Sequence, residues 1–254
     1  MKYADILSFG AGVNSVALAI LAINDGWRGE IVFSDTGAEW PETYCYIDYF
    51  MREWLQPRGF DVVRLKGMPW QRHGKGISLI EYCEAANVIP LAARRWCTSE
   101  WKVKPLQRYG YGRTFKKGEE QEDKTMIGIA IDERWRQPHR IRPLVDANIT
   151  RKGCIEIIET EGLDVPQKSG CFICPFMSKH QWRILWERHP ELFQRAMDLE
   201  DGANRGSSQH WNATLDPSGK ITLRQRKLAY ESQIELPGID MDDLLRYKPC
   251  ICTL

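Results

Sequence analysis

The feature of this chain that most constrains its fold is a glycine loop, residues 8–15, between its first apolar segment and its first helical pattern. Residues 3–8 are apolar enough to form a buried strand, and residues 14–24 carry apolar side chains at helical spacing. The loop between them reads Ser-Phe-Gly-Ala-Gly-Val-Asn-Ser. A strand that leads through such a loop into a helix is typical of α/β proteins with a parallel sheet.

The rest of the chain extends this alternation and then changes character. Further strands are expected over residues 31–34, 61–65 and 125–131, and a helix with proline in its first turn over residues 41–55. Later helices are expected over residues 152–161, 178–188 and 190–200. The sequence therefore predicts an α/β, Rossmann-like core with a parallel sheet over residues 1–150 and a mostly helical C-terminal region over residues 151–254.

Composition excludes several classes of protein. The 254 residues include 35 Lys+Arg and 34 Asp+Glu, for a net charge of +1, and 43% are hydrophobic. A disordered chain would contain fewer apolar residues, and no apolar run reaches the roughly 18 residues of a membrane span. The first residues do not resemble an export signal. We therefore expect a cytoplasmic protein whose eight cysteines are thiols or metal ligands rather than disulfides.

The glycine loop has the composition of a phosphate-binding loop. Small residues let backbone N–H groups approach a phosphate, and the helix N-terminus adds partial positive charge. A Walker A loop is excluded because no lysine follows the glycines. A dinucleotide fingerprint stays open, because Asp35 stands near the distance of a ribose-binding acid although Ser15 replaces the third glycine. The third interpretation is a tight turn without a ligand.

Local charge is uneven in residues 94–117. This stretch contains eight Lys and Arg residues against a single Glu, with Trp96, Trp101, Tyr109 and Tyr111 between them. Basic residues interleaved with aromatic ones suit phosphate contacts and base stacking, which favours a nucleic-acid partner. The alternative is a solvated basic face over buried aromatic residues.

Cys171 and Cys174 form a Cys-x-x-Cys motif followed by proline. At this spacing two thiolates on one turn can reach the same metal centre. A redox dithiol is the competing interpretation, although no thioredoxin-like context precedes the motif. Cys45 and Cys83 lie in helical patterns, where we expect core thiols.

Several blocks of the chain resemble one family. Residues 10–15 resemble the pyrophosphate loop (PP-loop) pattern Ser-Gly-Gly-x-Asp-Ser, with Gly10 in place of the first serine and Asn14 in place of the acid. Residues 35–43 look like the Asp-Thr-Gly-x-x-x-Pro-Glu-Thr signature of the phosphoadenylyl-sulfate (PAPS) reductase family. Further similar blocks follow in the family's order, at residues 95–106, 128–136, 142–146 and 170–175. Over roughly residues 4–180, the chain resembles the iron–sulfur-binding branch of the PAPS reductase-like family within the PP-loop, or adenine nucleotide alpha hydrolase, superfamily.

This resemblance implies a nucleotide site. The residues expected to bind the nucleotide are Ser8, Gly10, Ala11, Gly12, Asn14, Ser15, Asp35, Thr36 and Glu39. Asp35 is expected to act in catalysis. Four cationic residues are also expected to act there, by stabilising charge on pyrophosphate or sulfate: Arg95, Lys102, Arg134 and Arg136. Asn14 puts in question any role that needs a carboxylate at its position, such as metal contact.

The resemblance also implies a [4Fe–4S] cluster, with zinc as the alternative metal. Cys171, Cys174 and Cys97 would be ligands, because cluster-containing adenylyl-sulfate reductases have cysteines at a similar separation. Cys154 is the expected fourth ligand, so that four sulfurs converge beside the glycine loop. In the competing view, Cys154 is merely buried and one iron has an open position.

Three functions are consistent with these motifs. In the first and expected function, the protein is an ATP pyrophosphatase that uses Mg²⁺-bound ATP to adenylate a substrate such as nucleic acid. It then acts as a sulfurtransferase and replaces the activated oxygen with sulfur from sulfide or a cysteine desulfurase. In the second, a thiol reduces adenylyl sulfate or PAPS, and Cys250 or Cys252 would supply that thiol. In the third, the chain binds a nucleotide or nucleic acid without catalysis, which Asn14 favours.

Overall fold

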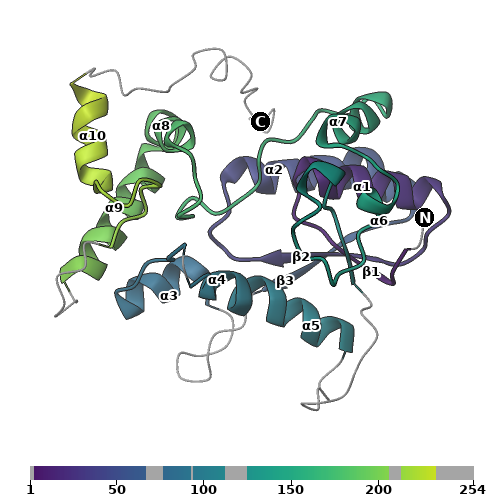
Figure 1. Ribbon diagram of the computed structural model, residues 1–254, viewed down its shortest axis with the longest axis horizontal. Helices are drawn as coiled ribbons and strands as arrows, with labels where there is room; N and C mark the ends of the chain where they lie inside the picture. Colours follow the sequence, from purple (N-terminus) through teal and green to yellow (C-terminus); the bar gives the residue numbers. More distant parts are fainter. Residues whose placement is uncertain (1–2, 67–76, 93, 112–124, 206–212, 233–254) are drawn as a thin grey trace.

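The computed structural model describes residues 3–66, 77–92, 94–111, 125–205 and 213–232. Its centre is a four-stranded sheet of order β3-β2-β1-β4 (Figure 1). The strands are β1 (Ile6–Ser8), β2 (Glu30–Asp35), β3 (Val62–Lys66) and β4 (Thr125–Ile127). Every pair is parallel, and Ile6 of β1 stands opposite both Glu30 and Thr125. This order confirms the predicted α/β fold with a parallel sheet.

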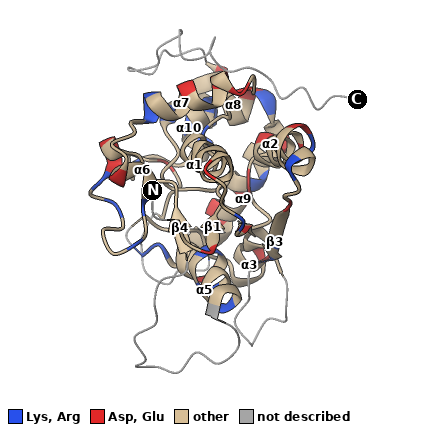
Figure 2. Cartoon of the chain, turned by 90° about the vertical axis from the view of Figure 1, so that its right-hand side faces the viewer, with Lys and Arg blue, Asp and Glu red and all other residues tan. Residues whose placement is uncertain are grey.

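Helices cover both faces of the sheet, as Figures 1 and 2 show from two directions. One face carries α1 (Val13–Asn24), α2 (Pro41–Phe50) and α7 (Arg151–Thr160), with the short α6 (Pro143–Asp146) near them. The other face carries α3 (Leu79–Ala86), α4 (Trp96–Thr98) and α5 (Lys104–Tyr111). Beyond the carboxyl ends of the strands lie α8 (Lys179–Arg188), α9 (Pro190–Arg205) and α10 (Leu223–Glu231), which confirm the mostly helical C-terminal part.

Two predicted elements end earlier than expected. The helix from Pro41 changes after Phe50 into a π-helical turn, η1 (Met51–Leu55), and then into a 3₁₀ turn, η2 (Gln56–Arg58). Strand β4 ends at Ile127 instead of residue 131. The next residue, Gly128, lies so close to the glycine loop that an added Cβ would be 2.7 Å from the Ser15 backbone. The chain then turns through a 3₁₀ segment, η4 (Ile131–Glu133).

Buried hydrophobic residues form two clusters. The first cluster includes Leu7 and Phe33 of the sheet together with Ile158 of α7. The second cluster includes Trp101, in the π-helical turn η3 (Ser99–Val103), and Trp182 of α8. Helix α7 belongs to the first cluster and α3 to the second, so the two clusters interleave along the chain. The domain boundary expected after residue 150 stays a prediction.

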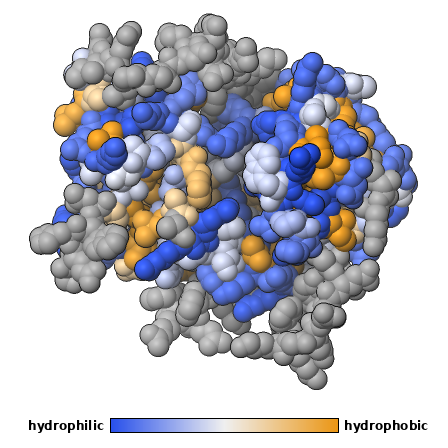
Figure 3. Space-filling model, in the orientation of Figure 1, coloured by the Kyte–Doolittle hydropathy of each residue, from blue (hydrophilic) through white to orange (hydrophobic). Residues whose placement is uncertain are grey.

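Hydrophilic residues cover most of the face seen in Figure 3, and hydrophobic residues stand between them in small groups. The large apolar side chains that are exposed include Trp135 and Phe176. In the described part of the chain, none of the helices has both the length and the apolar character that crossing a membrane requires.

Candidate functional site

The glycine loop is closed by one side chain. Ser15 Oγ accepts hydrogen bonds from the backbone N–H groups of Gly10, at 3.3 Å, and Gly12, at 3.2 Å, and it donates to Gly12 O at 3.0 Å. Ala11 between them adopts a left-handed conformation, with φ of 54°. Because Ser15 lies in the first turn of α1, these bonds hold the loop over a helix N-terminus, where the first N–H groups lack intrahelical acceptors. The loop is therefore shaped before any ligand arrives.

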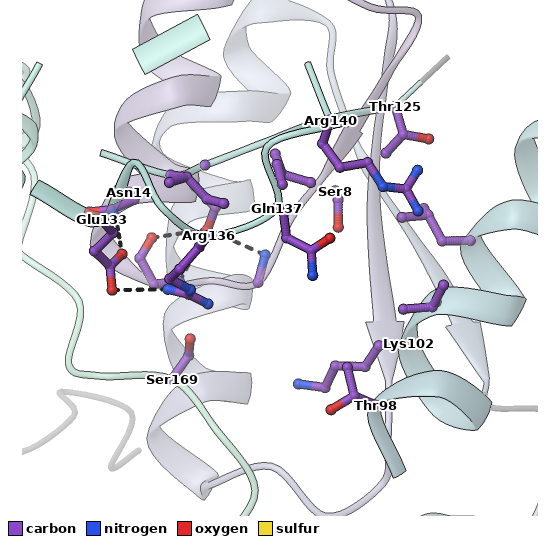
Figure 4. Close-up of a pocket in the computed structure, with 18 of the residues that line it drawn as sticks. Ser8, Asn14, Thr98, Lys102, Thr125, Glu133, Arg136, Gln137, Arg140 and Ser169 are labelled. Carbon is purple, nitrogen blue, oxygen red and sulfur yellow. Dashed lines mark hydrogen bonds and ion pairs between the residues drawn. The ribbon is translucent and has the colours of Figure 1, made fainter. Parts of the chain in front are cut away.

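A cleft of about 690 Å³ opens beside this loop, at the carboxyl ends of β1 and β4 (Figure 4). Open α/β sheets bind their ligands at this edge. Eight of the predicted site residues line it: Ser8, Gly10, Gly12, Asn14, Ser15, Arg95, Lys102 and Arg136. Nine further polar residues line the cleft and are not among the predicted site residues: Thr98, Gln107, Thr125, Glu133, Gln137, Arg140, Arg151, Lys168 and Ser169.

The cleft has a strong excess of positive charge. Its described lining contains six cationic residues, Arg95, Lys102, Arg136, Arg140, Arg151 and Lys168, and a single acid, Glu133. A cleft lined by one sign of charge concentrates ligands of the opposite sign. The predicted catalytic residue Arg134 is exposed and does not line the cleft; its backbone carbonyl instead accepts a hydrogen bond from Arg142. The cleft is suited to a ligand with several negative charges.

Four predicted nucleotide-binding residues lie outside the lining of the cleft. Ala11 is buried. Asp35 Oδ1 accepts hydrogen bonds from Gly37 N, at 2.8 Å, and from the Tyr44 hydroxyl, at 2.7 Å. Burial and this contact with Asp35 raise the pKa of Tyr44. Asp35 therefore fixes the turn that follows β2. The other two residues, Thr36 and Glu39, belong to a buried polar cluster.

That buried polar cluster consists of Thr36, Glu39, Lys102 and Cys171. Glu39 Oε1 accepts from Lys102 Nζ at 2.8 Å, from Thr36 Oγ1 at 3.2 Å and from Cys171 Sγ at 3.6 Å. The Glu39 side chain is only 1% exposed. Burial lowers the pKa of Lys102, but the Glu39 carboxylate and the neighbouring Cys171 outweigh this effect and raise it. Lys102 is therefore charged, and it connects the cleft to the cysteines.

The Cys-x-x-Cys loop is fastened to the segment after β2. Trp40 N donates to Gly170 O at 3.0 Å, and Phe172 N donates to Ala38 O at 2.9 Å. Cys174 N donates to Cys171 O at 3.1 Å and closes the turn between the two thiols. Burial raises the pKa of both thiols, and for Cys171 the nearby Glu39 adds to this rise.

Three of the predicted cluster ligands pack against one hydrophobic cluster, and the fourth lies in the other. Cys97, Cys171 and Cys174 all pack against the second hydrophobic cluster, which also contains the buried Cys83. Cys154 is fully buried in the first cluster, on α7, where burial raises its pKa to about 12. Helix α7 packs against α1, which places Cys154 in a different hydrophobic cluster from the other three cysteines. That four sulfurs share one centre stays a prediction.

The donor chemistry of Cys97, Cys171 and Cys174 fits an iron–sulfur cluster, because cysteine thiolates in apolar surroundings are its usual ligands. Within the described ranges, no three His, Cys, Asp or Glu side chains gather closely enough to hold a single metal ion. Cluster binding would therefore have to draw the three sulfurs together.

Part of the basic stretch 94–117 forms α4, η3 and α5, and its residues 112–117 lie outside the described residues. Trp101 is fully buried, with ring centroids 5.2 Å from Tyr82 and 5.9 Å from Trp96. The Tyr109 hydroxyl donates to Glu30 at 2.9 Å. These aromatic residues serve packing and hydrogen bonding within the fold. The prediction of a nucleic-acid partner for the stretch stays a prediction.

The sequence matches no protein-family model. It is 26% identical over 210 residues to an uncharacterized protein of Methanocaldococcus jannaschii; the match covers 78% of this chain and 48% of the relative, so the chain spans about half the relative's length. A crystal structure of PAPS reductase from Candida auris in complex with phosphate is similar over 67% of this chain and 82% of that one, with a TM-score of 0.43 and 14% identity. The function of this chain therefore has to be argued from its own residues.

Proposed function

We propose that the cleft binds ATP and that the protein cleaves it between the α and β phosphates. In this reaction AMP is transferred to an oxygen of a substrate, or to water when no substrate is present, and pyrophosphate leaves. The observation that carries the proposal is the glycine loop closed by Ser15, which opens onto a cleft lined by six cations. A triphosphate is a ligand whose charge matches that lining, and α1 presents its N-terminus to it.

The cations have distinct positions around the bound phosphates. Lys102 is already held in its charged form by Glu39, so it can neutralise charge on the leaving pyrophosphate without a change of protonation. Arg136 and Arg95 reach the cleft from two separate segments, after η4 and before α4. Guanidinium groups bind phosphate oxygens in pairs, which favours them for orienting the chain of phosphates.

In the second step of the proposal, sulfide attacks the substrate atom that bears the adenylated oxygen, and AMP leaves with that oxygen; nucleic acid is the expected substrate. What supports this step is the proximity of thiols to the cleft: Lys102 lines the cleft and belongs to the same buried polar cluster as Cys171. A [4Fe–4S] cluster would be held by Cys97, Cys171 and Cys174, with the fourth iron open. When bound, such a cluster supplies a position for the incoming sulfide.

The test uses anaerobically reconstituted protein with measured iron and zinc contents. The protein is incubated with ATP and Mg²⁺, and separately with adenylyl sulfate and with PAPS, while pyrophosphate and sulfite are assayed. The proposal predicts pyrophosphate from ATP. Sulfite from a sulfate nucleotide would support the reductase alternative, whose candidate thiols Cys250 and Cys252 lie outside the described residues. Tight nucleotide binding without either product would indicate a binding module.

A matched pair of lysine variants makes this test specific to the cleft. Lys102→Met removes a charge that lines the cleft. Lys152→Met removes an exposed charge from α7, which among the described residues pairs with Glu156 on its own helix. Pyrophosphate release should fall steeply in Lys102→Met and stay unchanged in Lys152→Met. Equal activity in the two variants would contradict the assignment of the reaction to this cleft.

A further inference from the structure

The glycine loop carries an unsatisfied buried polar atom beside the cleft. Asn14 lies in the first turn of α1 and is only 7% exposed. Its amide nitrogen donates to Glu133 Oε2 at 3.3 Å, but its amide oxygen is buried and has no hydrogen-bond partner among the described residues. Buried polar atoms without partners are rare in folded proteins, and each one calls for a reason such as a missing ion.

Glu133 is held beside Asn14 at the edge of the cleft (Figure 4). It ends η4, directly after the stretch in which Gly128 touches the backbone of the glycine loop. A bond from Ile131 N to Ile149 O, at 2.9 Å, anchors the same turn. The carboxylate stands between Asn14 and Arg136, whose Nη1 is 2.9 Å from Glu133 Oε1 (Figure 4). Residues 119 positions apart in sequence therefore meet at one point of the cleft.

The acid that the sequence predicts for nucleotide binding, Glu39, has a different environment. Glu39 is fully enclosed and shares one carboxylate oxygen among Lys102, Thr36 and Cys171. It does not line the cleft, whereas Glu133 does and keeps a third of its side chain exposed. The carboxylate within reach of a cation on bound phosphates is therefore that of Glu133.

We propose that the Asn14 amide oxygen and the Glu133 carboxylate together bind the divalent cation, Mg²⁺, that accompanies the nucleotide phosphates. Glu133, which contacts Asn14 directly, supplies the negative charge that the loop lacks at position 14. Mg²⁺ prefers oxygen ligands and is commonly held by one or two carboxylates together with substrate phosphates. The cation takes the place of Arg136 at the carboxylate, and this half-exposed guanidinium turns to the phosphates.

This site rests on the proposed nucleotide binding, so the experiment measures the two separately. Binding of α,β-methylene-ATP, which resists cleavage between the α and β phosphates, is first measured by calorimetry in EDTA. Mn²⁺ then serves as the probe: the loss of its free EPR signal gives its affinity for the protein saturated with that nucleotide. Glu133→Gln is compared with Glu156→Gln, a variant of an exposed acid on α7 outside the cleft.

We expect the affinity for Mn²⁺ to fall by about 10-fold or more in Glu133→Gln and to stay unchanged in Glu156→Gln. The double variant Asn14→Asp, Glu133→Gln moves the carboxylate to the other side of the same hydrogen bond, and it should restore most of the Mn²⁺ affinity. A purely structural role for Glu133 would not produce this rescue. Equal Mn²⁺ affinity in all nucleotide-bound variants would overturn the site alone. Absence of nucleotide binding in the wild-type protein would overturn the proposed function and the site with it.

Discussion

The cleft and the cysteine region beside it share Lys102 but are built differently. In the cleft, the loop faces open space: an added Cβ at Gly10 would meet no atom within 4 Å. In the cysteine region, Glu39 bonds inward to Lys102, Thr36 and Cys171 and is shielded from solvent. The comparison teaches that the glycine loop leaves room for a ligand, whereas the carboxylate beside the thiols already has its cation within the fold.

The largest expected effect tests which sulfurs belong to the cysteine region. Under the proposed cluster, Cys171→Ala should lose nearly all iron after anaerobic reconstitution, because one of three ligands is removed. Cys154→Ala should keep the wild-type iron content, because this thiol lies in the other hydrophobic cluster. Iron per chain, measured by atomic absorption, distinguishes the two. Full iron content in Cys171→Ala would contradict the ligand set.

The next effect concerns Lys102, where the two regions meet. Lys102→Met leaves the Glu39 carboxylate buried without its cation. The free energy of unfolding should therefore fall by about 2–4 kcal/mol. This is less than the loss at a fully buried ion pair, because the Lys102 side chain is partly exposed. Nucleotide affinity should fall as well. Urea denaturation and calorimetry measure the two quantities.

A second substitution separates the two roles of Lys102. In Lys102→Met with Glu39→Gln, the buried group is neutral, so most of the lost stability should return, while nucleotide affinity stays low because the cleft still lacks its cation. Recovery of nucleotide affinity together with stability would show that Lys102 acts only through the fold, and the distinction between the two regions would fail.

Three glycines provide a matched test of the preformed loop. Gly128→Ala should cost about 1–3 kcal/mol of unfolding free energy, because its Cβ would meet the Ser15 backbone at 2.7 Å. Gly10→Ala should leave stability unchanged but weaken nucleotide binding, because its Cβ would enter the cleft. Gly170→Ala, on the cysteine side and also without atoms within 4 Å, should change neither. Unchanged nucleotide affinity in Gly10→Ala would argue against phosphates lying on the loop.

The smallest effect is a pH dependence from Cys154. Its pKa is about 12 in the folded protein, against an ordinary value of 9.0, because the thiol is buried. Above pH 9 the unfolded chain releases this proton while the folded chain keeps it, so stability falls as pH rises from 9 towards 12. Between pH 7.5 and pH 10 the free energy of unfolding should therefore fall further in the wild type than in Cys154→Ala, by about 1 kcal/mol. Identical losses in urea denaturation at the two pH values would contradict this burial.

Local features of the sequence predicted the fold well. The order of strands and helices follows from apolar spacing, and the closure of the glycine loop depends on Ser15, Gly10 and Gly12, which are neighbours in the chain. The early end of β4 depends instead on the close approach of Gly128 to the loop, a tertiary contact that no local pattern reveals.

The site was less predictable because its decisive contacts join distant residues. Cys154 lies only 17 positions before Cys171 in the chain, but the packing of α7 against α1 places it in another hydrophobic cluster. Glu39 meets Lys102 across 63 positions, and Asn14 meets Glu133 across 119. The sequence shows that an acid, Glu133, follows β4, but it does not reveal that Glu133 contacts Asn14.

The position at which the protein cuts a nucleotide tests the central claim most directly. Wild-type protein is incubated with Mg²⁺ and ATP labelled at the α phosphate, and the labelled products are separated by chromatography. The account predicts labelled AMP, with pyrophosphate in equal amount and little product from Lys102→Met. Labelled ADP, or labelled AMP formed equally by wild type and Lys102→Met, would contradict it.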